Sequence, residues 1–260
     1  MNSGDTVRLG FFLLTFLLCV SWEILAPRRP LNFPRNSRWF NNIGMSLVNQ
    51  LLLRLAFPIL VVGVAVQAQQ SQWGLFNAIE LPGLMALILG LLLLDLTIYV
   101  QHRVFHRVNW LWKIHRVHHT DLDFDVTTAV RFHPIEMVLS TLIKMAVVIL
   151  LGVQPLAVLI FEIVLSLTSL FNHSNIFIPA GFDRVLRWGL VTPDMHRVHH
   201  SIEPGETNSN FGFNIPWWDH LFKTYRAQPR GGHGDMTLGL ADFRRADKLR
   251  LVDLLRLPFR

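Results

Sequence analysis

Long apolar runs alternate with short polar stretches over the first two thirds of the chain, and this pattern predicts membrane-spanning helices. The first run covers residues 9–26, the second about residues 43–68 and the third about residues 82–101. Each comes close to or exceeds the about 20 apolar residues with which an α-helix crosses a bilayer. We therefore expect three spans. A cleaved signal peptide, which would end in small residues, is the alternative for the first run.

Residues 136–172 hold two shorter apolar segments that meet at a turn containing Gly152 and Pro155. Glycine and proline at such a join predict an antiparallel helical hairpin. Each arm is short for a hydrocarbon core of about 30 Å, so the hairpin either spans with a tilt or is re-entrant. Residues 174–260 contain no further spanning run, and we expect them to form a cytosolic helical cap.

The composition agrees with a protein embedded in lipid. The chain of 260 residues is 51% hydrophobic and 16% charged, whereas soluble domains are about 25% charged. The net charge of +6 is dispersed around the apolar runs, which favours contact with anionic membrane lipids and argues against nucleic acid. The single cysteine, Cys19, excludes an internal disulfide and a thiolate-based site. We predict an all-α integral membrane bundle that forms one domain over residues 1–260.

Basic residues mark the cytoplasmic ends of the predicted spans. Positive loops stay in the cytoplasm, and counting spans from the first loop places the ends of the third span and of the hairpin on that same side. Every histidine cluster described below then lies on one face of the membrane. The basic residues are Arg28, Arg29, Arg35 and Arg38 after the first span, and Arg103, Arg107, Lys113 and Arg116 after the third.

Eight of the twelve histidines fall into three short motifs, HxxxH, HxxHH and HxxHH. On a helix, residues three and four apart share one face, so each motif presents a set of nitrogen donors. A lone histidine is more often a surface or core residue, but this clustering favours metal binding. The clusters are His102 and His106; His115, His118 and His119; and His196, His199 and His200.

The number and surroundings of these histidines narrow the chemistry. A structural zinc takes four ligands and a catalytic zinc three, so eight histidines indicate two ions. Imidazole binds zinc, iron, copper and nickel alike, so the ligands alone do not select the metal. HxxHH lacks the glutamate that HExxH proteases place between their histidines, which disfavours peptide hydrolysis. Oxygen chemistry at a dinuclear iron site is the leading hypothesis.

Two carboxylates inside the apolar runs are further candidates, because an intramembrane carboxylate is costly and by default marks function. Asp95 precedes His102 by seven residues on one helical face, and we expect it to orient a ligand imidazole. A packing pair with Arg54 or Lys144 is the alternative. Glu162 is expected to ligate or support the metal.

Four histidines lie outside the clusters. His173 follows Glu162 by eleven residues on one helical face, and we expect it to be a ninth ligand. His133 either ligates the metal or supports the first HxxHH helix together with Glu136. The remaining two, expected at the surface or in supporting roles, are His220 and His233.

The motifs HRVFH, HRVHH and HRVHH, with TTAVRFHP between them and a late NFGFNIPWWDHLFKTY, resemble the fatty acid hydroxylase or sterol desaturase superfamily. The resemblance covers roughly residues 90–226 and is strongest to small bacterial members and to the alkylglycerol monooxygenase branch. It implies that the eight clustered histidines are metal ligands and that His173 matches a further family histidine. Many members carry arginine where this chain has His220, which puts the role of that position in doubt.

The resemblance also implies an activity. Such enzymes are membrane-bound, non-heme di-iron oxygenases that use molecular oxygen and two external electrons to hydroxylate or desaturate a lipid. We expect two irons, which zinc can replace in purified protein, and a separate electron donor that is cytochrome b5-like, ferredoxin-like or a pterin. The expected location is the bacterial inner membrane, with the metal site on the cytoplasmic side.

Hydroxylation of a fatty acyl, alkylglycerol or sterol-like lipid is the favoured activity, and desaturation is the alternative within the superfamily. From a different class, the chain could be a metal transporter or a non-catalytic metal-binding membrane protein. Transport is disfavoured because the histidines gather on one face while the outer halves of the spans are almost entirely apolar. An inactive relative is expected to have broken histidine clusters, and none is broken here.

Overall fold

The structure is a computed structural model that describes residues 3–57 and 59–260. Over these residues the fold contains helices and turns but no β-strands, and two isolated β-bridges are its only extended pairings. This confirms the predicted all-α class. The long helices are α1 (Ser3–Leu25), α2 (Arg35–Ala56), α3 (Val61–Gln70), α5 (Gly83–Arg107), α6 (Asn109–His119), α7 (Pro134–Leu151) and α8 (Pro155–Asn172). The short ones are α4 (Leu75–Ala78), α9 (Ala180–Leu186), α10 (Pro193–His199), α11 (Pro204–Thr207), α12 (Trp217–Leu221), α13 (Gly232–Asp235) and α14 (Leu251–Arg256), with 3-10 turns at Val126–Val130, Ala246–Lys248 and Leu257–Phe259.

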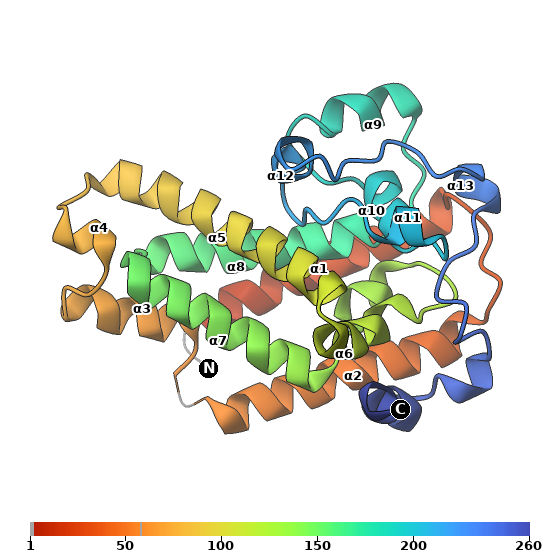
Figure 1. Ribbon diagram of the computed structural model, residues 1–260, viewed down its shortest axis with the longest axis horizontal. Coiled ribbons are helices and arrows are strands. Elements are labelled where there is room, and N and C mark those ends of the chain that lie inside the picture. The colour runs from red at the N-terminus through yellow and green to blue at the C-terminus, as the bar shows by residue number, and fades with distance from the viewer. Residues whose placement is uncertain (1–2, 58) are drawn as a thin grey trace.

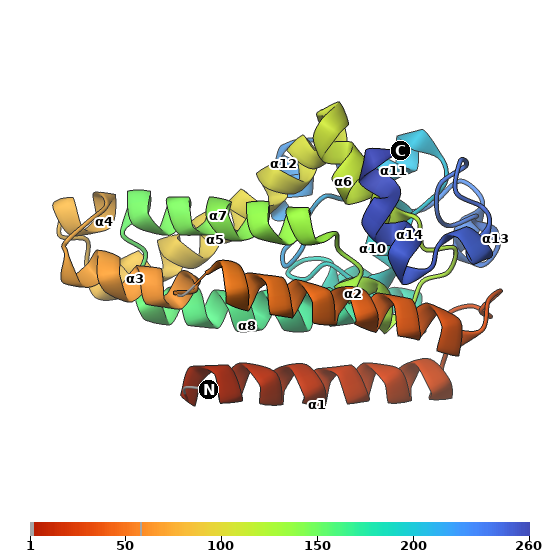
Figure 2. The same ribbon diagram turned by 90° about the horizontal axis from the view of Figure 1, so that it is seen from below.

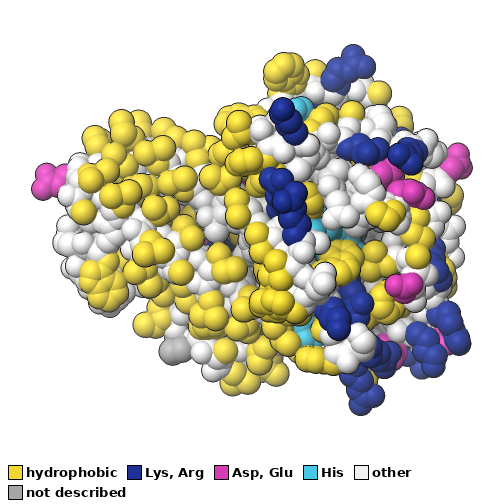
Figure 3. All heavy atoms as spheres, in the orientation of Figure 1, with side chains coloured by type: hydrophobic (Ala, Val, Ile, Leu, Met, Phe, Trp, Pro, Cys, Tyr) yellow, Lys and Arg dark blue, Asp and Glu magenta, His cyan; other side chains and the backbone are white. Residues whose placement is uncertain are grey.

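Five helical segments of the described chain are long and apolar enough to cross a membrane. Their outer faces carry exposed hydrophobic side chains such as Leu17 and Leu25, which suits contact with lipid. Hydrophobic side chains cover the half of the molecule that holds α3, α5 and α7, whereas Lys and Arg side chains gather over the other half (Figure 3). The multi-pass architecture predicted from the sequence is therefore confirmed. The segments are Thr6–Leu25, Arg35–Ala78, Gly83–Arg107, Pro134–Leu151 and Pro155–Asn172.

The second predicted span, residues 43–68, lies within the apolar segment Arg35–Ala78, but it is divided between two helices. α2 ends at Ala56, the backbone of Phe57 is extended, with φ −125° and ψ 105°, and α3 begins at Val61. The sequence places Pro58 next, outside the described residues, and a residue that precedes proline is disfavoured in the α conformation. α3 then packs against α7 and α8.

α2 also begins earlier than predicted, because its first turns are polar and buried at the same time. Arg38 and Asn42 are at most 8% exposed, and both hydrogen-bond to Asp121 in the loop that follows α6. Because these polar side chains are paired inside the protein, this part of α2 lacks the apolar sequence pattern by which a membrane helix is recognised. The start of α2 is therefore a support for the site and only its later part resembles a span.

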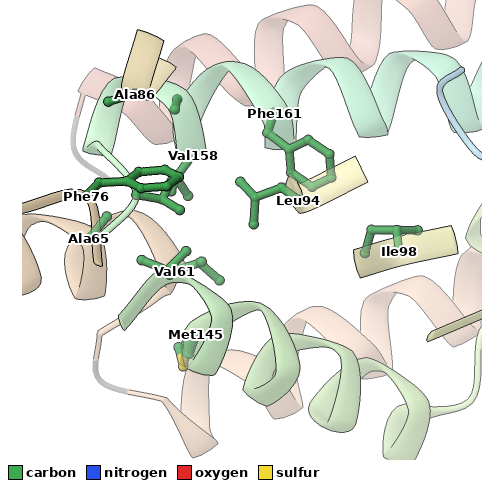
Figure 4. Close-up of a cluster of buried hydrophobic side chains, with 12 residues drawn as sticks. Val61, Ala65, Phe76, Ala86, Leu94, Ile98, Met145, Val158 and Phe161 are labelled. Carbon is green, nitrogen blue, oxygen red and sulfur yellow. The ribbon is translucent and has the colours of Figure 1, made fainter. Parts of the chain in front are cut away.

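The apolar core of the bundle forms where α3, α4, α5, α7 and α8 meet (Figure 4). Val61, Phe76, Leu94, Val158 and Phe161 are each at most 6% exposed there. The helix α1 lies outside this core and packs on α8 along one side of the bundle (Figure 2). The helices of the bundle thus form the frame that positions the C-terminal ends of α5 and α8.

The predicted hairpin of α7 and α8 is confirmed, and its turn depends on Gly152. This residue adopts φ +68°, a left-handed conformation that ends α7, and Pro155 opens α8. A Cβ added at Gly152 would lie 2.6 Å from the carbonyl oxygen of Trp73. Glycine is therefore needed both for the backbone conformation and for the close approach of the α3–α4 turn.

The chain after α8 forms a cap of short helices and loops at one end of the bundle, over the ends of α5 and α8 (Figure 1). Its last helix returns to the frame, because Leu254 of α14 is buried in a cluster with Met45 of α2 and Val117 of α6. The cap therefore encloses the ends of the helices that carry the histidine motifs.

Candidate metal centre

Nine histidines converge between the cap and the ends of the spanning helices, and they form two groups. Within each group one nitrogen of every imidazole lies within 4.8 Å of those of the others. All nine histidines that the sequence singled out are present. The five-histidine group contains His102, His106, His115, His119 and His199, and the four-histidine group contains His118, His173, His196 and His200.

The two HxxHH motifs divide between the groups in opposite ways. On α6, His115 and His119 join the five-histidine group, while His118 joins the four-histidine group. At the end of α10 the division is reversed, because two of its histidines join the four-histidine group and only His199 joins the other. Residues four apart lie one above the other on a helix, and the residue at i+3 points to a slightly different side. Each HxxHH helix therefore lies between the two groups and serves both.

Backbone carbonyls orient two of the imidazoles in the five-histidine group. His102 Nδ1 donates to the carbonyl oxygen of Phe211 at 2.9 Å, and His199 Nδ1 donates to that of Ser209 at 2.7 Å. This loop is itself fixed by Asp219, whose carboxylate accepts the backbone N–H of Phe211 and that of the next residue, each at 2.8 Å. With the proton held on Nδ1, each Nε2 presents a free lone pair to the group.

Two more imidazoles are held from the outer side. His115 Nδ1 lies 2.6 Å from the carboxylate of Glu136, and His173 Nδ1 donates to the carbonyl oxygen of Ser169 at 2.8 Å. A carboxylate or carbonyl behind a histidine fixes its tautomer and its ring orientation, as it does behind metal-binding histidines. Both groups therefore contain imidazoles whose Nε2 is turned inward.

The inward nitrogens lie at the spacing of ligands that share one cation. His115 Nε2 is 3.2 Å from His119 Nε2, and His173 Nε2 lies 3.1 Å from His118 Nε2 and 3.0 Å from His196 Nε2. Ligand nitrogens about 2.0–2.1 Å from an ion, at roughly 90–110° to each other, lie about 3.0–3.4 Å apart. Facing lone pairs repel unless a cation lies between them, so these residues fit a metal ion in each group.

Burial favours the neutral form of several of these histidines. Eight of the nine are buried, and only His106 is of intermediate exposure. Burial lowers the pKa of His173 and of His199 to about 3. Burial, with neighbouring histidines adding to it, also lowers the pKa of His118 and of His196 well below the usual value. Neutral imidazole is the form that binds a metal ion.

The structure corrects both carboxylate predictions. Asp95 accepts a hydrogen bond from Trp218 Nε1 at 2.7 Å, and Glu162 pairs with Arg8 at 2.9 Å and with Lys144 at 3.3 Å. Neither contacts a histidine. A helix rises about 1.5 Å per residue, so sharing a face over seven or eleven residues still leaves about 10 or 16 Å along the axis.

The three histidines outside the groups have structural contacts. His133 caps α7 by accepting the N–H of Ile135 and also bonds the carbonyl oxygen of Leu255, each at 3.2 Å. It is therefore outside both groups, and of the two residues expected to support the first HxxHH helix, Glu136 is the one that bonds a histidine of that helix. The other two are His220, exposed and stacked on Tyr225, and His233, which is buried 3.6 Å from Asp194.

A buried polar network behind α6 is absent from the sequence predictions. Arg38 binds Asp121 at 2.8 Å and Asp125 at 2.5 Å, while Arg131 donates to Asn42 and Thr120, each at 2.8 Å. Although burial alone would raise the pKa of Asp121, the adjacent Arg38 holds it below its usual value. The network fixes the loop that follows His118 and His119. Part of its sequence signal is the TTAVRFHP motif, which supplies Arg131.

Comparisons with known proteins agree with this site. A family model described as fatty acid hydroxylase matches residues 87–224. Ornithine lipid hydroxylase OlsE of Rhizobium tropici is 29% identical, over 86% of this chain and 69% of its own length. Alkylglycerol monooxygenase of Xenopus tropicalis is 31% identical over 63% of this chain, and human cholesterol 25-hydroxylase is 30% identical over 52%.

This chain spans only 36% of the frog protein and 49% of the human one. No solved structure gives a significant match.

Proposed function

This chain belongs to the fatty acid hydroxylase family, and from that premise we propose that it is a membrane lipid hydroxylase with a di-iron site. The observation that supports the proposal best is the pair of histidine groups, in which inward nitrogens lie 3.0 to 3.2 Å apart. Matched relatives are named as hydroxylases or monooxygenases of ornithine lipid, alkylglycerol and cholesterol. Their common chemistry is the oxidation of a lipid.

The residues that would hold the two irons are the two histidine groups, one ion in each. When bound, such metals supply the activation of molecular oxygen that oxidation of an unactivated C–H bond requires. Nine neutral nitrogen ligands and no cysteine among them also leave zinc as a possible replacement in purified protein.

The protein's own contribution is orientation and exclusion of water. Glu136 and the carbonyl oxygens of Ser209 and Phe211 keep three imidazoles turned inward, so the ligands need no rearrangement when metal binds. The cap covers the histidines and leaves them buried, which protects a reactive centre from solvent. Two electrons would come from a separate donor of the cytochrome b5, ferredoxin or pterin type.

We place the site on the cytoplasmic side of a bacterial inner membrane. Arg28, Arg29 and Arg35 lie in or next to the loop between α1 and α2, at the same end of the spans as the histidines. Basic residues concentrate on the cytoplasmic side of membrane proteins.

Metal analysis combined with isotope tracing tests the proposal. Protein purified gently from iron-supplied cells is expected to hold about two irons per chain, as the two groups require. Lipids from cells that express the protein under oxygen-18 are expected to gain one labelled oxygen atom, and a loss of two hydrogens would instead indicate desaturation. A protein with two filled sites that oxidises no lipid would exclude the lipid hydroxylase and leave a non-catalytic metal-binding protein.

A further inference from the structure

An apolar groove of about 610 Å³ opens on the side of the bundle between α5 and α7. Both of these helices are membrane-spanning segments, so the groove opens toward lipid. Val100 and Trp110 on its rim are 46% and 59% exposed. Its lining comes from α5 between Leu93 and Phe105, from Trp110 and Leu111 of α6, and from α7 between Leu139 and Leu151.

The groove has the length of one hydrocarbon chain. On α5 the lining runs from Leu93 to Phe105 and on α7 from Leu139 to Leu151, so the first and last residues are twelve positions apart in each case. At about 1.5 Å per residue, both stretches measure roughly 18 Å. This is comparable to half of the about 30 Å hydrocarbon core, which is the depth occupied by the chain of a lipid in one leaflet.

Only one end of the groove approaches the histidines. The ring of Phe105 lies 6.0 Å from that of His115 and is itself 2% exposed, so it forms the wall between the groove and the five-histidine group. Leu150 and Leu151 lie at the opposite end, near the hairpin turn. A chain in this groove therefore presents one of its ends, and not its middle, to the metal centre.

The end beside Phe105 is also the polar end. Arg107 and Lys113 are exposed, and they lie three residues before and three residues after the rim residue Trp110. The Oε1 atom of Gln101 in the lining has no hydrogen-bond partner, whereas the hydroxyl of Thr97 is bound to the carbonyl oxygen of its own helix at 2.7 Å. Cations at this end suit an anionic headgroup, and the unpaired amide oxygen suits a hydrogen-bond donor next to it, which leaves the apolar end for the chain terminus.

We propose that this groove holds the hydrocarbon chain of the lipid substrate, with the headgroup at Arg107 and Lys113, so that the carbons nearest the headgroup are oxidised. This inference rests on the proposed function and adds the direction of binding and the region attacked. The far end of the groove lies roughly 18 Å from Phe105. Oxidation at the terminal methyl is therefore excluded for a chain bound in this direction.

Photolabelling and product analysis test the proposal separately. The labelling probe is phosphatidylglycerol with a diazirine at the middle of one acyl chain, in nanodiscs that contain iron-free protein. The variants Leu139→Trp and Val147→Phe fill the groove to different degrees. Leu142→Trp is the matched control, because Leu142 lies on the same helix, is 47% exposed and does not line the groove.

Labels are expected on groove residues of α5 and α7, with at least a severalfold loss in both filling variants and none in the control. The oxygen-18 atom in lipids from expressing cells is expected near the headgroup, located by fragmentation mass spectrometry, and its yield should fall in parallel with the labelling. The inference is overturned if groove labelling or the yield of oxygen-18 lipid is unchanged in the filling variants. It is also overturned if the oxygen is found at the terminal methyl. If the groove is labelled but the protein oxidises no lipid, the groove is a binding site for a lipid chain and the proposed function is wrong.

Discussion

The two histidine groups differ in how much of the chain holds them in place. In the five-histidine group, His102, His115 and His199 are each bonded from behind, and His106 has intermediate exposure. In the four-histidine group every member is buried, and His173 is tied only to a carbonyl of its own helix. One group is thus oriented by contacts from several elements and the other mainly by enclosure.

The two identical HRVHH motifs contribute differently to the two histidine groups. HRVHH occurs twice with the same letters, yet α6 gives two ligands to the five-histidine group and one to the other, while α10 does the opposite. Identical sequences therefore occupy complementary positions around two centres. The division of ligands between centres is a property of helix placement and is absent from the motif itself.

Each HxxHH motif gives two ligands to one histidine group and a single ligand to the other. Removing that single ligand, His118 or His199, is expected to have the largest effect on lipid oxidation. His118→Ala leaves the four-histidine group with three ligands, whereas His199→Ala leaves the other group with four. Both variants are expected to lose more than about 100-fold in lipid oxidation. Iron is expected to fall toward about one per chain in His118→Ala but to stay nearer two in His199→Ala, since four ligands suffice for an ion.

Iron per chain and the rate of product formation are measured on the same preparations. His220→Ala is the control, because this histidine is exposed and stacks on Tyr225 away from both groups. Equal loss of iron from the two ligand variants would contradict the division into five and four.

A change to the carboxylate behind His115 is expected to have a smaller effect, and one confined to the five-histidine group. Glu136→Gln keeps a hydrogen-bonding group but removes the charge that lies 2.6 Å from His115 Nδ1. Iron affinity of the five-histidine group is expected to fall about 10- to 100-fold, with the other group unchanged. A chelator titration that follows the fraction of iron retained measures this. The iron of the five-histidine group should be lost at a lower chelator concentration than in the parent, and the iron of the four-histidine group at an unchanged one.

Glu162→Gln is the matched control for that titration. Glu162 was predicted to serve the metal but pairs with Arg8 and Lys144. If Glu162→Gln weakens iron retention, Glu162 does support the metal, as the sequence predicted. If Glu136→Gln leaves iron retention unchanged, Glu136 does not orient His115 for metal binding.

The sequence identified what helical spacing can encode. His102 and His106, or His115 and His119, are four residues apart, so their common face followed directly from the helix period. The apolar runs and the Gly152 turn predicted the spans and the hairpin in the same way. Iron and the di-iron count stay predictions, because ligand identity does not select a metal.

The sequence could not supply distances between elements or the roles of backbone atoms. Asp95 shares a helical face with His102 but lies about 10 Å away along the axis, and its partner Trp218 follows more than a hundred residues later. Carbonyl oxygens of Ser209 and Phe211 carry no side-chain signal at all. Asp219, which fixes their loop, lies in the WWDH stretch, and nothing in that stretch indicates the backbone N–H groups that its carboxylate accepts.

Acid is expected to act on the enclosure of the four-histidine group through His233. This buried residue lies behind α10, 3.6 Å from Asp194, and burial lowers its pKa from about 6.5 to about 4. Because the folded pKa is the lower one, the unfolded chain binds the extra proton, and stability falls as the pH drops from about 6.5 toward 4. At pH 5 the loss from this group is about 2 kcal/mol.

The variant His233→Gln removes this titration, so its thermal midpoint should fall a few degrees less than that of the parent between pH 7 and pH 5. Both proteins carry the same ligand histidines, so only the difference between their two slopes reports on His233. His220→Gln, at an exposed position, should keep the slope of the parent. Parallel slopes for the parent and His233→Gln would mean that acid weakens the enclosure of α10 by another route.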